Sequence, residues 1–222
     1  MLISHRKKFI YTKTSRTAGT SVESYFEKFC MPEAEWEFAL NREVHIGKEG
    51  IIGYRGYSPA GKKWRNHMPA IEIKEAIGHS VWDDYFKFCV IRNPFDKLVS
   101  GFFFFHKDKI DSDKISRIDV IKGFRKWIKN GRFIFDRDKY FIDENICIDY
   151  FIMHEGLSNG IREVCKLLDI PFESERIPAL RTEFRDREFK LLDLYDKETR
   201  AIVSAKYEFE LDYFGYEAPD LS

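Results

Sequence analysis

Residues 13–21 combine cationic, hydroxyl-bearing and small side chains in a pattern that suits the binding of an anion. In order, the segment reads Lys13, Thr14, Ser15, Arg16, Thr17, Ala18, Gly19, Thr20 and Ser21. A planar guanidinium such as that of Arg16 pairs with phosphate or sulfate oxygens, and small residues let a ligand approach the backbone. A helix that starts here points unpaired N–H groups and its positive dipole end at the loop. The segment therefore predicts an anion-binding turn.

Two other interpretations of this turn have to be weighed. A Walker A motif is excluded, because G-x-x-x-x-G-K-[ST] cannot be placed here and no Lys follows Gly19. An ordinary capped helix start stays open, since Thr20 and Glu23 have the spacing of a capping box.

A second cationic turn follows the apolar run Phe86–Ile91. The run ends in Arg92, Asn93 and Pro94, and Ser100 comes about two helical turns later, on roughly the face of Arg92. Asn before Pro is typical of a helix start. An Arg and a hydroxyl that converge from a strand end and a helix flank suit a second phosphate. A surface Arg and a packed Ser are the simpler alternative.

Both turns fall between an apolar run and a helical pattern. Phe9–Tyr11 and Phe86–Ile91 are expected to be buried strands, and helices are expected from Thr17 and from Asn93. Strands that alternate with helices predict an α/β fold whose central, mostly parallel sheet has helices on both faces. In such sheets ligands bind at the carboxyl ends of the strands, where both turns would lie.

The remaining segments complete this α/β pattern. Residues 31–66 are Gly-rich and are expected to form loops with short strands, and residues 108–120 a charged surface connection. We further expect helices at Ala70–Ile77, Phe124–Ile128, Asn159–Leu168 and Thr199–Phe209, and a strand at Ile146–Met153.

Composition limits the class of protein. The 222 residues carry 37 basic and 37 acidic side chains, so the chain as a whole has no attraction for nucleic acid and any anion site must be local. Its length suits one domain, residues 1–222. Four scattered cysteines are expected to be buried free thiols. No leader or membrane-spanning run is found, which predicts a cytoplasmic protein without a transmembrane segment.

Together, the two turns resemble the motifs of the sulfotransferase superfamily, in the branch of carbohydrate sulfotransferases and their bacterial relatives. The family's 5′-phosphosulfate loop, Pro-Lys-Thr-(Ala/Gly)-Gly-Thr-Ser, is similar to residues 15–21, with Arg16 in the place of the family's Lys. Its 3′-phosphate motif, Arg-(Asn/Asp)-Pro followed by a Ser, matches residues 92–94 and Ser100. Weaker similarity extends through residues 148–157, 177–181 and 214–216.

The resemblance implies a fold akin to the P-loop kinases and a single sulfotransferase domain. It implies that the chain moves a sulfuryl group from 3′-phosphoadenosine 5′-phosphosulfate to a hydroxyl or amine of a carbohydrate or another small acceptor, releasing adenosine 3′,5′-bisphosphate and needing no metal. The donor-binding residues it implies are Arg16, Thr17, Ala18, Gly19, Thr20, Ser21, Arg92 and Ser100. Arg181 and Arg185 would close over the nucleotide, and Lys13 is a second candidate for the loop ammonium.

Acceptor activation calls for a general base, which His supplies near neutral pH. His67 is our choice, because it precedes the helix that leads into the Arg92 strand and resembles the base-bearing His of the 2-O-sulfotransferases. His106 is the rival, and Glu23 is less favoured because a capping role would account for it. The alternatives to a sulfotransferase are a P-loop-like nucleotide phosphotransferase and a non-catalytic nucleotide- or glycan-binding module.

Overall fold

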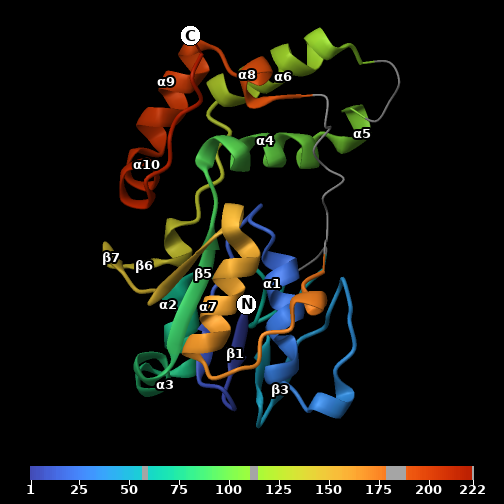
Figure 1. The fold of residues 1–222 in the computed structure, drawn as a ribbon, viewed down its shortest axis with the longest axis vertical. Coiled ribbons are helices and arrows are strands. Elements are labelled where there is room, and N and C mark those ends of the chain that lie inside the picture. Colours follow the sequence, from blue (N-terminus) through green and yellow to red (C-terminus); the bar gives the residue numbers. More distant parts are fainter. Residues whose placement is uncertain (57–59, 111–114, 179–188, 222) are drawn as a thin grey trace. The chain divides into compact units, whose positions relative to one another are not determined.

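The computed structural model describes residues 1–56, 60–110, 115–178 and 189–221, and the chain in it groups into two compact units. Unit 1 comprises Met1–Ile91 and Phe135–Leu180, and unit 2 comprises Arg92–Ile134 and Arg181–Ser222, each within the described ranges. Figure 1 shows the elements of both units along the chain. The expectation of one domain over residues 1–222 stays a prediction.

A six-stranded sheet forms the centre of unit 1. Its order is β3-β4-β1-β2-β5-β8. The strands are β1 (Leu2–Ser4), β2 (Phe9–Tyr11), β3 (His45–Gly47), β4 (Gly50–Ile52), β5 (Phe86–Ile91) and β8 (Tyr150–Met153). The pairs β2–β5 and β5–β8 are parallel, whereas β1–β2, β1–β4 and β3–β4 are antiparallel. The sheet is therefore mixed, and the expectation of a mostly parallel sheet holds only for its β2-β5-β8 half.

Helices cover both faces of this sheet, as expected. One face packs Phe9, Phe88 and Ile152 against α1 (Gly19–Phe26) and α7 (Leu157–Leu167), which Figure 1 shows together on one side of the strands. The other face packs Ile10 against α2 (Ala70–Ile77) and α3 (His79–Asp84). Side chains of a strand point alternately to its two faces, which is why neighbouring residues of β2 enter different cores.

Close helix–sheet packing in unit 1 depends on a glycine in α7. A Cβ on Gly160 would lie 2.5 Å from a methyl carbon of Ile152 on β8, so any other residue would force the Ile152 side chain or the helix to shift. The small hairpin β6 (Phe141–Ile142) and β7 (Asn145–Ile146) completes the strands. Short 3-10 turns lie at Glu27–Phe29, Glu33–Glu35, Arg137–Lys139, His154–Gly156 and Ser174–Arg176.

Unit 2 is helical in the part of the chain that the structure describes. Its elements are α4 (Pro94–Phe105), α5 (Lys107–Ile110), α6 (Arg117–Lys129), α8 (Leu191–Leu194), α9 (Lys197–Lys206) and α10 (Glu208–Phe214). Aromatic residues fill its core, among them Phe95, Phe124 and Tyr195, whose rings meet edge to face. The Tyr195 hydroxyl also donates a hydrogen bond of 3.0 Å to the Phe95 carbonyl, so this buried polar group is satisfied.

Most predicted elements are present, with changes at their ends. The strands at Phe9–Tyr11 and Phe86–Ile91 and the helix at Ala70–Ile77 are confirmed with the predicted bounds. The predicted strand over residues 146–153 divides into β7 and β8, and the predicted helix over residues 199–209 breaks at Tyr207 into α9 and α10. The strand β1 and the helix α3 were not expected. The cysteines are free thiols, three of them buried and Cys147 intermediate.

Candidate functional site

The loop between β2 and α1 is held at several points along its length. The Thr12 N–H donates to the Phe88 carbonyl at 3.1 Å, which extends the pairing of β2 with β5. The Thr14 hydroxyl donates to the Val90 carbonyl and lies 2.8 Å from the Thr17 hydroxyl oxygen. These bonds fix the loop beside the carboxyl end of β5, which is where the parallel arrangement of the two strands predicts a ligand site.

Backbone conformation sets this loop apart from an ordinary helix start. Arg16 and Ala18 both have φ of 60°, in the left-handed region that residues with a Cβ rarely adopt. Left-handed residues occur in the concave N–H arrangements that bind anions, and backbone strain is often found at functional sites. Ala18 is the N-cap of the eight-residue helix α1, and its side chain caps nothing.

This geometry corrects the capping-box alternative for Thr20 and Glu23. Thr20 lies inside α1 instead of at its N-cap, so the pair cannot form the reciprocal capping bonds. Glu23 is instead a fully buried carboxylate that accepts from the Lys13 ammonium and, at 3.0 Å, from the Arg55 guanidinium. The amino-terminal ammonium of Met1 lies 2.6 Å from its other oxygen. The capping role for which Glu23 was less favoured as a base is therefore wrong. A carboxylate that is paired with three cationic groups is nevertheless a poor base, because these groups stabilise its ionised form.

Buried charges form a network beneath the loop. Arg55 joins Glu23 to Glu27, and Glu27 also accepts from the Nε of Arg42 at 3.1 Å. Burial by itself would raise the pKa of Glu23, but the charges of Lys13, the Met1 ammonium and Arg55 together hold it well below its usual value. Glu23 is thus ionised at any pH near neutrality. In this network the side-chain cations of Lys13, Arg42 and Arg55 and the amino group of Met1 face the carboxylates of Glu23 and Glu27, and burial lowers the pKa of the Met1 ammonium.

His67 lies against the same loop, brought there by the turn before α2. Its Nδ1 is 3.1 Å from the carbonyl oxygen of Lys13 and 3.4 Å from the Ser15 hydroxyl oxygen. A carbonyl oxygen only accepts, so Nδ1 carries the hydrogen and Nε2 carries the lone pair. His67 also has a left-handed backbone, with φ of 55°. The tautomer with its hydrogen on Nδ1 is the one that a base acting through Nε2 requires.

The charge state of His67 follows from its surroundings. The residue is exposed at the surface, but the protein atoms packed around its ring desolvate it, and this desolvation is the main cause that lowers its pKa to about 4. The Lys13 ammonium lowers the pKa further, while Asp136 and Glu23 act in the opposite direction. The imidazole is therefore neutral at pH 7. An anion bound nearby would raise this pKa, because it would stabilise the imidazolium form.

The second predicted turn has the expected local structure. Asn93 is the N-cap of α4, and its side-chain oxygen accepts from the Phe95 N–H at 2.9 Å, with Pro94 in the first turn. Arg92 is half-buried and is bonded directly to Ile91, the last residue of β5. Ser100 lies in the second turn of α4 and is also half-buried. Arg181 and Arg185 lie outside the described residues.

The rival base, His106, is part of the aromatic core of unit 2. Its ring centroid lies 4.5 Å from that of Phe102, and its Nδ1 lies 2.9 Å from the Phe102 carbonyl oxygen. In the adjacent run of four phenylalanines, Phe102 and Phe103 are buried, whereas Phe104 and Phe105 are more exposed. This pattern is that of a core-facing helix and its flank, and it favours a packing role for His106.

Two residues that support the loop were not expected from the sequence. Asp136 is buried, and its Oδ2 accepts from the Ser15 N–H at 2.9 Å. Arg55 is the centre of the ion network and comes from the loop-rich segment after β4. Neither residue belongs to a sequence motif that includes its partner. Asp136 lies 121 positions along the chain from Ser15, and Arg55 lies 32 positions from Glu23.

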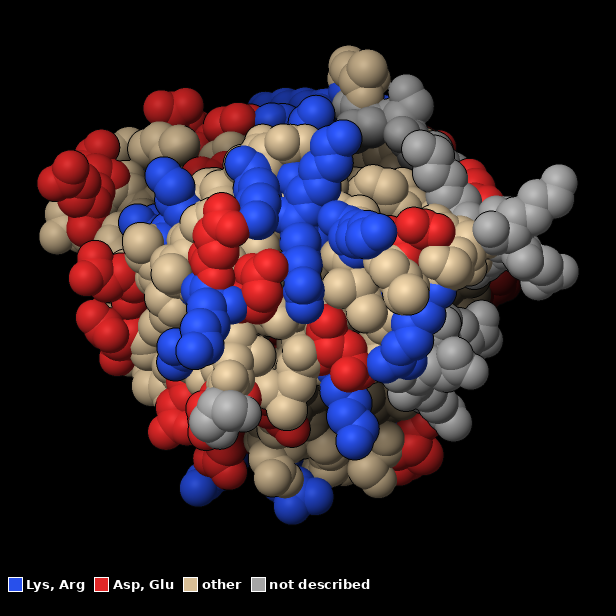
Figure 2. All heavy atoms as spheres, turned by 90° about the horizontal axis from the view of Figure 1, so that it is seen from above, with Lys and Arg blue, Asp and Glu red and all other residues tan. Residues whose placement is uncertain are grey.

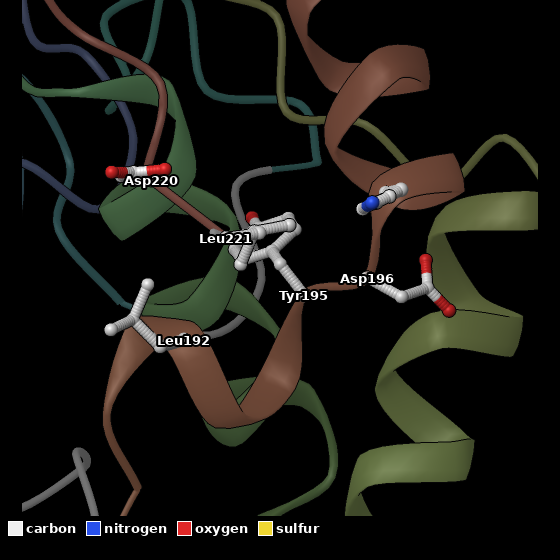
Figure 3. A pocket seen from close by; sticks show the side chains of 6 residues that line it. Leu192, Tyr195, Asp196, Asp220 and Leu221 are labelled. Atoms are coloured by element: carbon white, nitrogen blue, oxygen red, sulfur yellow. The ribbon is translucent and has the colours of Figure 1, made fainter.

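A separate pocket of about 340 Å³ lies within unit 2. Figure 3 shows its lining, which consists of Leu192, Tyr195, Asp196, Lys197, Asp220 and Leu221. None of the predicted donor-binding residues is among them. The Asp196 carboxylate is the N-cap of α9, where it accepts from the Thr199 N–H at 2.8 Å, so a structural role accounts for it.

Helix α6 of unit 2 is strongly basic. Lys122, Lys126 and Lys129 are exposed, and Asp119 is the single acidic residue of the helix. Figure 2 shows Lys and Arg side chains gathered on this side of the molecule, with Asp and Glu between and around them. Ion pairs with Asp193, Asp196 and Glu198 neutralise Arg117, Arg125 and Lys129 in part.

Among the described residues, no group of three acidic, His or Cys side chains could hold a metal ion. None of the described helices is both long and apolar enough to cross a bilayer.

Comparison with known proteins gives two matches. The model of the sulfotransferase family matches residues 1–140, which is more than half of the chain and includes both cationic turns. An uncharacterized protein of Archaeoglobus fulgidus is 28% identical over 112 residues, which cover 48% of this chain and 86% of that protein. No solved structure matches the chain.

Proposed function

Because the chain belongs to the sulfotransferase family, we propose that it transfers a sulfuryl group from 3′-phosphoadenosine 5′-phosphosulfate to a hydroxyl, or less readily an amine, of a carbohydrate or another small acceptor. The observation that carries this proposal is the β2–α1 loop. Left-handed Arg16 and Ala18, an uncapped helix start and buried cations paired with Glu23 combine there at the end of a parallel strand pair. This part of unit 1 has the strand–loop–helix order of P-loop-like nucleotide-binding folds.

The residues of the loop fit the donor's phosphosulfate end. Helix geometry leaves the N–H groups of Gly19 and Thr20 without intrahelical partners, whereas the Ser21 N–H also donates to the Ala18 carbonyl at 2.9 Å, and the Arg16 side chain adds a cation. The Tyr11 hydroxyl is buried with no hydrogen-bond partner among the described residues, and it lies only 3.2 Å from where a Cβ on Gly19 would be. We assign the 5′-phosphosulfate to Arg16, Thr17 and the N–H groups of residues 18–21. We assign the 3′-phosphate to Arg92 and Ser100.

The bound donor would supply a sulfuryl group on a phosphate leaving group. Sulfuryl transfer resembles phosphoryl transfer in that the protein mainly aligns the reactants and stabilises charge on the transferring oxygens. The loop N–H groups and Arg16 would do this here. His67 would accept the proton of the acceptor hydroxyl at Nε2 while the acceptor oxygen bonds to sulfur and the bridging S–O bond breaks. Lys13, the other candidate for the loop ammonium, would have to leave Glu23 to reach the donor.

Calorimetry with adenosine 3′,5′-bisphosphate tests the donor assignment. We expect binding without Mg²⁺, and much weaker binding of ATP. Arg92→Ala should weaken the bisphosphate by about 10- to 100-fold, because a hydrogen bond to a charged group is worth about 1.5–3 kcal/mol. His67→Ala should bind the bisphosphate normally but lose turnover in a donor-loaded acceptor screen read by mass. Tighter binding of ATP with Mg²⁺ would favour a phosphotransferase, and binding of neither nucleotide would favour a glycan-binding module.

A further inference from the structure

Lys13 occupies an unusual place for a lysine at the edge of an anion site. Its side chain is only 5% exposed, and its ammonium pairs with Glu23, whose side chain is 1% exposed. The ammonium also donates to the Thr20 hydroxyl oxygen at 3.3 Å. A buried ammonium is costly unless it is paired, and here the pairing directs it under the first turn of α1.

The stem of Lys13 runs along the start of α1. A Cβ on Gly19 would lie 2.9 Å from the Lys13 Cγ and 3.0 Å from its Cε, closer than carbon atoms normally approach. Glycine at position 19 is therefore what allows this lysine to pack against the helix. The side chain of Lys13 thus packs against Gly19 and binds both Glu23 and Thr20 through its ammonium.

The main chain of Lys13 supports a second element. Its carbonyl oxygen accepts the Nδ1 hydrogen of His67 at 3.1 Å, from a residue 54 positions along the chain. A histidine without such an acceptor has no fixed ring orientation, and its hydrogen can be on Nε2 instead of Nδ1. One residue thus contacts the loop that would hold the donor and the imidazole that would take the acceptor's proton.

We propose that Lys13 is a positioning residue that couples the two halves of the reaction site: its carbonyl fixes the orientation and tautomer of His67, and its side chain, anchored on Glu23, holds the first turn of α1. The inference rests on the proposed function for its meaning in catalysis. Its structural content, the tautomer of His67 and the effect of the Lys13 ammonium on the titration of His67, can be measured without any activity.

Charge adds a second link between Lys13 and the imidazole. The charged groups that act on His67 are Lys13 and the Met1 ammonium, which disfavour the imidazolium, and Asp136 and Glu23, which favour it. Removing the Lys13 charge should therefore make His67 easier to protonate. Desolvation remains the larger cause, so the titration midpoint should stay below that of an exposed histidine.

Lys13→Met tests the proposal, because methionine keeps most of the stem beside Gly19 and removes the ammonium. Glu23 retains the Met1 ammonium and Arg55 as partners, so no buried carboxylate is left alone. In ¹⁵N-histidine-labelled protein, assigned with His67→Gln, wild-type His67 should show a hydrogen on Nδ1 and titrate at about pH 4. The variant keeps the main-chain carbonyl of residue 13, so His67 should keep its hydrogen on Nδ1. It should titrate at higher pH and bind adenosine 3′,5′-bisphosphate about 2- to 10-fold more weakly, the size of one net hydrogen bond.

Lys8→Met is the matched control, since Lys8 is exposed and pairs only with Asp84 among the described residues. It should change none of the three measurements. A wild-type His67 with its hydrogen on Nε2 would overturn the proposal even if the variant failed to fold. So would a Lys13→Met protein whose titration of His67 and nucleotide affinity both match the wild type. If the nucleotide does not bind to either protein while the His67 measurements change as expected, the proposed function fails and the positioning role stands.

Discussion

Replacing Arg55 by methionine tests whether the buried ion network supports the loop. The Arg55 side chain is 3% exposed and makes bonds in four directions. Its Nη1 donates to Glu23 and Glu27, its Nε to the Leu40 carbonyl at 2.8 Å, and its Nη2 to the Ala39 carbonyl at 2.7 Å. Methionine fills much of the same volume but satisfies none of these four acceptors.

The expected loss is large because it leaves buried charge behind. Glu27 would keep only Arg42 as a cationic partner among the described residues, and Glu23 would keep Lys13 and the Met1 ammonium. Removing one member of a buried ion pair typically costs about 3–5 kcal/mol, and here both carboxylates lose a charged donor at once although each keeps another cationic partner. Urea denaturation followed by circular dichroism should show this loss in the free energy of unfolding. Nucleotide affinity, measured where the variant is still folded, should fall as well, because Glu23 anchors Lys13.

Arg65→Met is the matched control for this experiment. Arg65 pairs with Glu72 at 2.6 Å, but both side chains are about one third exposed. An ion pair of this kind contributes about 0–1 kcal/mol. If Arg55→Met and Arg65→Met lower the free energy of unfolding equally, the network does not stabilise the loop floor and the argument from burial is refuted.

Two further predictions concern the loop and its pH dependence. Gly19→Ala should destabilise the protein by about 1–3 kcal/mol through overpacking against Lys13. Gly123→Ala in α6 is the control: a Cβ there would meet Phe102 at 3.6 Å, and the substitution should stabilise the protein by up to about 1 kcal/mol. Equal effects of the two substitutions in thermal melts would contradict the close approach of Lys13 to Gly19. The folded pKa of His67 is below its unfolded value, so the unfolded chain binds the proton first and stability should fall as the pH drops from about 6.5 to about 4. Below pH 4.5 the lowered pKa of Glu23 should continue the loss, and His67→Gln should remove only the upper step.

Local patterns explain why one half of the sheet could be predicted from the sequence. The run Phe86–Ile91 and the Asn93–Pro94 helix start carry their signals within ten residues, and both were predicted correctly. The strand β1 has only three residues, Leu2–Ser4, and is antiparallel to β2 and β4. A strand of three residues is too short to show an alternation of apolar and polar side chains, so the antiparallel half of the sheet could not be inferred from the sequence.

The candidate site divides in the same way. The chemical groups of the loop were visible in residues 13–21, because anion recognition needs them close together in sequence. The groups that position the loop come from distant segments, as Asp136 and Arg55 show. Glu23 was read as a capping residue because spacing alone cannot distinguish a capping glutamate from a buried one.

Strain and charge at the loop have a common physical explanation. Arg16, Ala18 and His67 all have left-handed backbones, and each such conformation costs about 1–3 kcal/mol unless its surroundings enforce it. Buried ion pairs are poor stabilisers in general, because desolvation offsets most of their attraction. A network of buried, paired charges beside strained N–H groups is therefore hard to explain by stability alone. It is explained if the loop must hold its donors in place before a polyanion arrives, because donors that are already oriented do not have to reorganise during the reaction.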